Sequence, residues 1–190
     1  MKNKFKYLKP TFVLLMISII VSGALVLTKH FTAAEAVTDP AEIIEQNREN
    51  YLEVLPGDEN FEFIYHNTDF EDNTVGVPVE AVKSSVGYVI TVHSSKQYSS
   101  QPIRILVGIL NDGSVSSIKI LRISETPGLG SNVQSKSFLE QFIGGSGFSL
   151  DGSFGTKING VTSATKSSRA VTDAVNLALE EFARLSGGAE

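Results

Sequence analysis

The sequence contains no cysteine among its 190 residues. Disulfide bonds, thiolate-bound zinc and cysteine-ligated iron–sulfur clusters are therefore excluded. The three histidines, His30, His66 and His93, do not show the spacing of metal ligands, so no metal site is predicted. Any redox chemistry carried out by this chain has to use an organic cofactor.

The chain is also poor in positive charge, with 16 Lys and Arg against 21 Asp and Glu and a net charge of −5. It lacks the basic face that neutralises phosphates along a duplex, so nucleic acid is not an expected partner. It also lacks the patterns of a catalytic triad, a paired-carboxylate acid–base site and a P-loop, so no catalytic residue is predicted.

Charge of either sign is missing from Pro10 to Thr28, a run of 19 residues. As a helix this run would span roughly 28 Å, close to the hydrocarbon thickness of a bilayer. Four lysines precede the run and one lysine and one histidine follow it, which favours a cytoplasmic N-terminus. We predict cytoplasmic residues 1–9, a transmembrane anchor at 10–28 and an extracytoplasmic remainder. A cleaved signal peptide remains an alternative, because Ala34-Glu35-Ala36 matches a small-x-small cleavage pattern.

The segment 29–57 is predicted to lie next to the membrane and to contain a helix. Asp39 and Pro40 suit the N-cap and the first helical position, and Pro56-Gly57 ends the helical pattern. The helix is either a stalk that joins the anchor to the following domain or one edge of that domain's core.

Residues 58–190 are predicted to form one domain, and its middle is rich in β-strand patterns. Alternating apolar residues begin at Phe61, Val86 to Val92 is a second strand, and Ile103 to Leu121 is a hairpin around Asn111-Asp112-Gly113. In the first hairpin strand, Ile103, Ile105, Val107 and Ile109 alternate with Arg104, Leu106 and Gly108, which indicates one face buried more completely than the other.

The last element is predicted to be a helix with an apolar stripe and a C-terminal end at Gly187-Gly188. Ser167 or Ser168 is expected to cap its first turn. The stripe consists of Val171, Val175, Ala178, Phe182 and Leu185. Strands between two helices predict an α+β domain with a mainly antiparallel sheet and flanking helices.

Two segments carry more special residues than a connection needs. In residues 124–130, Pro127-Gly128 suits the centre of a type II turn, and Gly128 with Gly130 allows the backbone to approach a flat ligand. Residues 159–169 place hydroxyls and the positive charges of Lys166 and Arg169 at the start of the last helix, where a phosphate can bind. Taken singly, the first segment also reads as a tight connection and the second as a capping loop.

The two segments together, about 35 residues apart, resemble those of one family. This is the FMN-binding domain of the G subunit of Rnf-type electron-transport complexes and of the C subunit of sodium-pumping NADH:quinone oxidoreductases. The resemblance extends over Gln101 to Arg104, the Asp112-Gly113 turn, Glu125 to Gly130, Thr162 to Val171 and the N-terminal anchor.

The resemblance implies that a flavin transferase attaches FMN, through its phosphate, to Thr165. It also implies further FMN contacts from Thr162, Ser163, Ala164, Glu125, Thr126, Gly128, Leu129 and Gly130. Glu125 would accept a hydrogen bond either from the flavin or from the backbone of its own turn. Two residues depart from the family pattern: Ser163 replaces the usual glycine, and Asn159 replaces a frequent acidic residue.

By this resemblance the chain is expected to be an electron-transfer subunit of a membrane-bound, ion-translocating oxidoreductase of the Rnf type. Its partners would be the other membrane and peripheral subunits, and it would bind no NADH itself. The compact region between the two segments favours the G subunit over the longer C subunit. A stand-alone exported flavoprotein is a further alternative, and a membrane-tethered binding module without flavin is the non-redox one.

Overall fold

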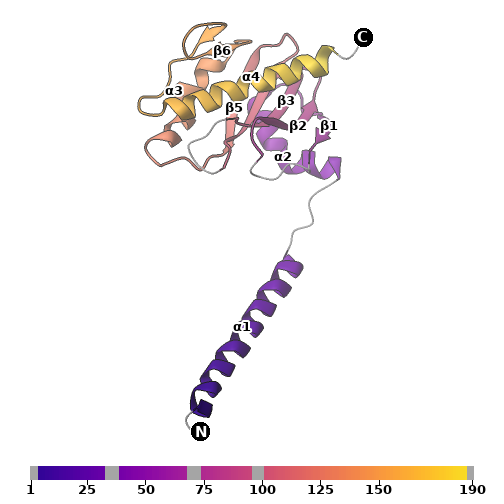
Figure 1. The fold of residues 1–190 in the computed structure, drawn as a ribbon. Helices are drawn as coiled ribbons and strands as arrows, with labels where there is room; N and C mark the ends of the chain where they lie inside the picture. The colour runs from indigo at the N-terminus through magenta and orange to yellow at the C-terminus, as the bar shows by residue number, and fades with distance from the viewer. Residues whose placement is uncertain (1–3, 33–38, 68–73, 96–100, 188–190) are drawn as a thin grey trace. The chain divides into compact units, whose positions relative to one another are not determined.

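The computed structural model describes residues 4–32, 39–67, 74–95 and 101–187, and it divides the chain into two compact units, Met1–Thr38 and Asp39–Glu190 (Figure 1). The first unit contains helix α1 (Lys4–Thr32), which includes Pro10. The predicted cleavage pattern Ala34-Glu35-Ala36 lies outside the described residues.

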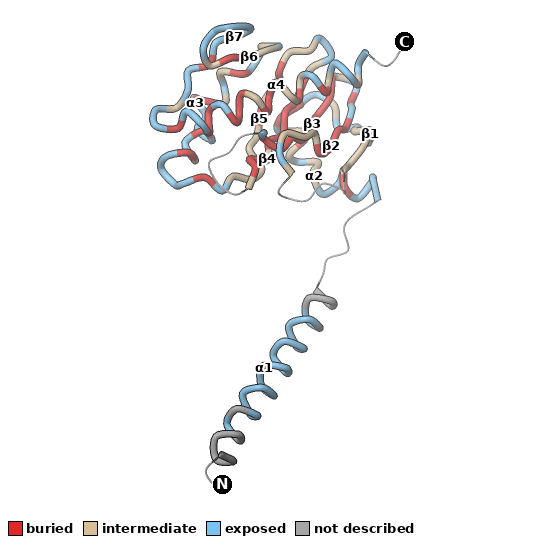
Figure 2. Tube along the Cα trace, viewed as in Figure 1, coloured by how far each residue is buried: buried red, intermediate tan, exposed pale blue. Residues whose placement is uncertain are grey.

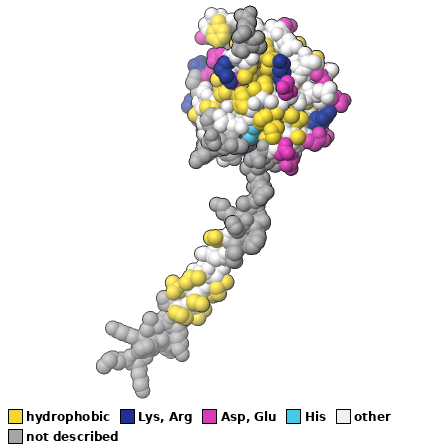
Figure 3. All heavy atoms as spheres, turned by 90° about the vertical axis from the view of Figure 1, so that its right-hand side faces the viewer, with side chains coloured by type: hydrophobic (Ala, Val, Ile, Leu, Met, Phe, Trp, Pro, Cys, Tyr) yellow, Lys and Arg dark blue, Asp and Glu magenta, His cyan; other side chains and the backbone are white. Residues whose placement is uncertain are grey.

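Helix α1 exposes the large apolar side chains that are described between Phe12 and Val26. In Figure 3 the described side chains of this helix are predominantly hydrophobic. Within the described part of the chain, no helix has both the length and the hydropathy that a membrane span requires.

The second unit opens with helix α2 (Pro40–Val54), as predicted. The Asp39 carboxylate accepts a hydrogen bond from the Ala41 backbone N–H at 2.9 Å, which satisfies one of the unpaired donors of the first turn. Tyr51 and Val54 are 1% and 0% exposed. Helix α2 is therefore an edge of the domain's core rather than a stalk.

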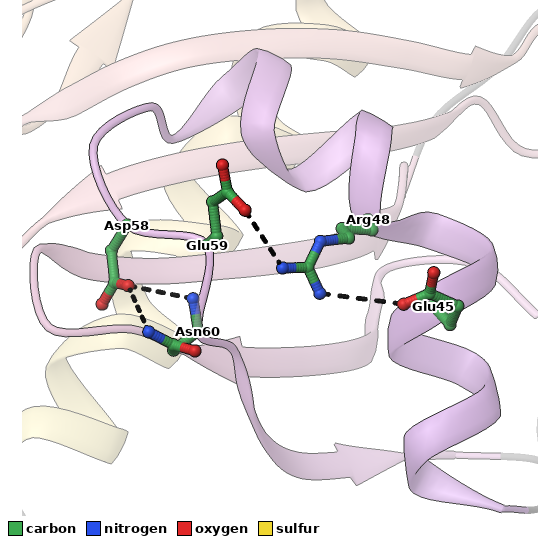
Figure 4. A network of polar contacts seen from close by, with 5 residues as sticks. All are labelled: Glu45, Arg48, Asp58, Glu59 and Asn60. Atoms are coloured by element: carbon green, nitrogen blue, oxygen red, sulfur yellow. Dashed lines mark hydrogen bonds and ion pairs between the residues drawn. The ribbon is translucent and has the colours of Figure 1, made fainter.

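A surface network of polar contacts joins α2 to the loop that follows it (Figure 4). Arg48 contacts Glu59 at 3.4 Å and Glu45 at 3.7 Å. In the loop, the Asp58 carboxylate accepts from the backbone N–H groups of Asn60 and Ser85. Hydrogen bonding from Ser85, then from Asn60, lowers the pKa of Asp58 to about 2. The loop is thus tied both to α2 and to a turn of the sheet.

Five antiparallel strands form the sheet, each paired with its neighbours in the sequence. They are β1 (Glu62–His66), β2 (Val77–Lys83), β3 (Gly87–His93), β4 (Arg104–Leu110) and β5 (Val115–Arg122). The predicted strand after Phe61, the strand over 86–92 and the hairpin are confirmed, whereas β2 was not predicted. The hairpin turn contains Gly113 with a φ of 84°.

A helix covers each face of the sheet, and Figure 2 shows the buried residues concentrated between them. Helix α4 (Thr165–Gly187) packs mainly against β3 and β4, while α2 packs against β4 and β5. The expectation that one face of β4 is buried more completely is confirmed: Ile105, Val107 and Ile109 on the α4 face are all 0% exposed, whereas Arg104 and Leu110 on the α2 face are only partly buried. The close approach of α2 depends on Gly108, where a Cβ would lie 2.1 Å from the Val54 carbonyl oxygen.

The α2 face of the sheet encloses a polar cluster around Glu80, which is 3% exposed. The Tyr51 hydroxyl donates to the Glu80 carboxylate at 2.5 Å, His66 Nδ1 lies 2.6 Å from it, and the Thr91 hydroxyl donates at 3.4 Å. Burial, reinforced by the nearby Glu80 charge, raises the pKa of Tyr51. The buried carboxylate is thus supplied with partners from three different elements.

Short elements that the sequence did not predict connect β5 to α4. They are the 3₁₀ helix η1 (Gly130–Gln134), helix α3 (Lys136–Leu139), the 3₁₀ helix η2 (Glu140–Phe142) and the parallel pair β6 (Phe148–Ser149) and β7 (Thr156–Lys157). Helix α4 follows the prediction: Val171, Val175 and Ala178 of its stripe are fully buried. The domain is α+β with an antiparallel sheet and flanking helices.

Candidate functional site

The first segment singled out in the sequence folds into a tight turn. The Leu129 N–H donates to the Thr126 carbonyl oxygen at 3.2 Å, and Gly128 has a φ of 77°. Pro127 therefore occupies the second position and Gly128 the third, where a type II turn requires a positive φ. Helix η1 secures this turn, because the Gly128 N–H donates to the Ser131 hydroxyl at 3.0 Å.

The second segment contains a turn of similar form. The Ala164 N–H donates to the Val161 carbonyl oxygen at 3.0 Å, which places Ser163 at the third position. Ser163 has a φ of 63° and is the non-glycine residue with positive φ in the described part of the chain. This is the position at which the family pattern has glycine, so the departure from the pattern puts an L-residue in the left-handed region.

Two side chains hold the loop that carries this turn. Gln141 bonds both backbone groups of Asn159: its Nε2 donates to the Asn159 carbonyl oxygen at 3.2 Å, and its Oε1 accepts from the Asn159 N–H at 2.8 Å. The Ser168 hydroxyl accepts from the Val161 N–H at 2.9 Å. The loop is thus fixed at two points before it enters α4.

Helix α4 begins at Thr165, and its first backbone hydrogen bond runs from the Ser168 N–H to the Ala164 carbonyl oxygen. The prediction that Ser167 or Ser168 caps the helix is wrong, because both serines lie inside it. Their hydroxyls serve longer-range contacts: Ser168 bonds Val161, and Ser167 bonds Glu125.

The two turns and the start of α4 surround a cavity of about 350 Å³. This volume falls within the range of small-molecule sites, roughly 300–1,000 Å³. The lining residues are Glu125, Thr126, Leu129, Gly130, Ser163, Ala164, Thr165, Lys166 and Ser167. The structure thus brings together both predicted segments. Of the predicted FMN contacts, Thr162 and Gly128 lie outside this lining.

Thr165 is exposed at the N-terminal end of α4 and lines the cavity. The positive end of the dipole of this 23-residue helix favours a negatively charged group at the threonine, and Lys166 adds a positive charge in the cavity wall. Arg169, which the sequence placed with Lys166, instead lines a separate cavity with Asp151.

One wall of the cavity contains a buried contact between the two segments. The Ser167 hydroxyl donates to Glu125 Oε2 at 3.2 Å, and the two residues are 2% and 7% exposed. A Cβ on Gly130 would lie 2.5 Å from Glu125 Oε2 and 2.8 Å from Ser167 Oγ. Only glycine fits at position 130 without displacing this pair.

Sequence reasoning missed the roles of Gln141 and Ser167. Ser167 was predicted only as a possible helix cap, but the partner of its hydroxyl is 42 residues away in the sequence. No local signal marks Gln141, because its partner is the backbone of a distant loop. Glu125 has a side-chain partner in Ser167 that neither of the two interpretations of its role included.

The cavity lies in a part of the chain that matches a known family. Residues 98–180 match the model of the FMN-binding domain family, and this range includes both turns and Thr165. The G subunit of an ion-translocating oxidoreductase complex from Methanosarcina acetivorans is 31% identical over 182 residues, which cover 92% of this chain and 93% of that relative. The chain belongs to the G-subunit family of ion-translocating oxidoreductase complexes.

Other members of the G-subunit family show the same likeness. The G subunit of the Na⁺-translocating ferredoxin:NAD⁺ oxidoreductase complex of Acetobacterium woodii is 29% identical over 193 residues, covering 92% of this chain and 90% of that relative. The G subunit of the proton-translocating ferredoxin:NAD⁺ oxidoreductase complex of Clostridium ljungdahlii is 36% identical over 108 residues, covering 55% of this chain and 57% of that relative.

Proposed function

We propose that this chain is the electron-transferring G subunit of a membrane-bound, ion-translocating ferredoxin:NAD oxidoreductase of the Rnf type, and that it carries FMN attached through its phosphate to Thr165. The observation that supports the attachment is the exposed Thr165 hydroxyl at the N-terminus of α4, in the wall of a cavity within an FMN-binding domain. The relatives' names differ in the ion that is moved, so the proposal names none.

The residues of the cavity suit FMN in two respects. The helix N-terminus and Lys166 favour the negative charge of a phosphodiester. Leu129 and Ala164 offer apolar surface beside the polar groups of Glu125 and Thr126. When bound, FMN supplies one- and two-electron redox chemistry, and the chain's task is to hold and tune it.

The described residues of α1 do not by themselves reach the hydropathy of a membrane span. We nevertheless propose the uncharged run at 10–28 as the membrane anchor, with the N-terminus cytoplasmic and the FMN domain extracytoplasmic, because 19 helical residues match the thickness of a bilayer. The exposed apolar side chains of α1 and the excess of lysine before the run support this topology. Attachment of FMN has a physical reason outside the cell, since a cofactor that dissociates there is lost. The flavin transferase is a partner during maturation, and the other subunits of the complex are the lasting partners.

The alternatives differ in what the chain assembles with or in whether it binds flavin. Two G subunits align with this chain over about nine tenths of its length, which favours the G subunit over the C subunit of the quinone reductase and over a stand-alone flavoprotein. The cavity at the helix start disfavours the binding module without flavin, in which residues 162–168 would only cap the helix.

The test is to co-express the full chain with a flavin transferase and to view a denaturing gel under ultraviolet light. We expect a fluorescent band that survives denaturation and disappears in Thr165→Ala. Thr156→Ala changes an exposed threonine of β7 outside the cavity and should retain the band. The attachment would be refuted if the wild-type band were not fluorescent, or if Thr165→Ala kept the fluorescence.

A further inference from the structure

The Ser167 side chain lies in the cavity wall but has no part in the proposed attachment, and its hydrogen bond explains its placement. Its hydroxyl donates to Glu125 Oε2 at 3.2 Å, and both side chains are almost completely buried. A carboxylate withdrawn from water needs hydrogen-bond donors to offset its lost hydration. Ser167 supplies one such donor from the first turn of α4.

The contact also has a defined orientation. Gly130 closes over the pair so tightly that a single added carbon atom would overlap Glu125 Oε2. Glu125 begins the segment that forms the turn Thr126–Leu129, and Ser167 lies two residues after Thr165. The hydrogen bond therefore fixes the carboxylate in the cavity wall relative to the helix that carries the attachment threonine.

We propose that Ser167 is a positioning residue that acts through Glu125: its hydroxyl orients the carboxylate at the cavity and disperses part of its negative charge, and this sets the midpoint potential of the FMN. The proposal rests on the proposed function. A negative charge close to a group that gains electrons disfavours its reduction, and a donated hydrogen bond weakens that effect. Loss of the Ser167 hydroxyl should therefore make the FMN harder to reduce.

The experiment compares midpoint potentials of the full chain, labelled with FMN by co-expression with a flavin transferase. We expect Ser167→Ala to shift the potential to more negative values and Glu125→Gln to shift it to more positive values. In the Glu125→Gln background the additional Ser167→Ala change should have a much smaller effect, because no charge remains to disperse. Ser167→Thr keeps the hydroxyl and should stay close to the wild type.

An unchanged potential in Ser167→Ala, or equal shifts in the two backgrounds, would overturn the proposal. If Ser167 had only a structural role, Ser167→Ala would lower the thermal unfolding midpoint, and its effect on the midpoint potential would be the same with Glu125 and with Gln at position 125.

The same variants made without the transferase separate this proposal from the proposed function. In the unlabelled chain, Ser167→Ala should lower the thermal unfolding midpoint, and it should do so less in a Glu125→Ala background. Additive effects would refute the coupling whether or not FMN binds. If labelled Ser167→Ala has the same midpoint potential as the labelled wild type, only the positioning role is refuted. If the wild type takes up no FMN label, the proposed function is refuted.

Discussion

Two of the buried glutamates, Glu80 and Glu125, lie on opposite sides of the sheet and have different surroundings. On the α2 face, Glu80 is bonded by Tyr51, His66 and Thr91 and lies inside the domain. At the start of α4, Glu125 is bonded by Ser167 and lines a cavity of about 350 Å³. Burial alone therefore does not distinguish the two carboxylates.

The difference lies in where the partners come from and what space remains beside them. The partners of Glu80 belong to α2, β1 and β3, so that cluster links elements of the scaffold. Ser167, which donates to Glu125, belongs to the helix that begins with Thr165, and both residues line a cavity that leaves room for a ligand. We infer that the α2 face determines stability and the start of α4 determines cofactor properties, and three variants test this division.

The largest effect is expected for Gly108→Ala on the α2 face. The new Cβ would lie 2.1 Å from the Val54 carbonyl oxygen, so α2 has to move away from β4. Such overpacking against backbone should lower the free energy of unfolding by about 3 kcal/mol, measured by chemical denaturation. FMN labelling of Thr165 should persist in the molecules that remain folded.

Gly147→Ala is the matched control, since a Cβ there meets no atom within 4 Å. It should change the free energy of unfolding by less than about 0.5 kcal/mol. Equal losses in the two variants would contradict the close approach of α2 at Gly108.

A smaller loss is expected for Tyr51→Phe, which removes the hydroxyl that donates to Glu80 at 2.5 Å. Because the substitution leaves a buried carboxylate with one donor fewer, it should lower the free energy of unfolding by about 2 kcal/mol. Tyr65→Phe is the comparison, and it should lower the free energy of unfolding less than Tyr51→Phe does. Tyr65 donates to Glu181, and without this bond Glu181 keeps both of its contacts with Arg184. If Tyr51→Phe altered the midpoint potential of the FMN as well, the division between the two faces would be wrong.

The smallest change in stability is expected for Ser163→Gly in the loop before α4. Glycine adopts the φ of 63° without strain, so the folded state should gain at most about 1 kcal/mol, partly offset by the greater freedom of the unfolded chain. The rate of FMN attachment should rise, measured by gel fluorescence against time. Ser163→Ala keeps the strained backbone and should not show this increase. Equal rates in the two variants would assign the effect to the lost hydroxyl instead.

The elements that the sequence predicted are those with strong local patterns. Helix α2 has Asp39 at its N-cap and Pro56 after its end, and the β4–β5 hairpin surrounds Asn111-Asp112-Gly113. The stripe on α4 repeats at helical spacing over five residues. The Pro127-Gly128 turn was predicted because two residue types with fixed backbone preferences stand side by side.

The features that the sequence did not predict depend on distant contacts. Strand β2 contains Pro78 and Glu80, two residues that are uncommon inside a strand. The burial of Glu80 is explained only by its contacts with Tyr51 and His66, which lie in other elements. The start of α4 was placed too late because the hydroxyls of Ser167 and Ser168 resemble caps. Their actual partners, Glu125 and Val161, are set by the tertiary fold.

The strand order β1-β2-β3-β4-β5 has a consequence for maturation. Each strand pairs with the one before it, so the sheet can assemble through contacts that are short in sequence, which are the ones that form rapidly. Helix α4 comes last and docks on β3 and β4. The hydroxyl of Thr165 enters its final setting only when that docking is complete. A modifying enzyme that needs the assembled cavity would thus act only on folded molecules. The molecules that carry the attached cofactor would then be those in which α4 has docked on the sheet.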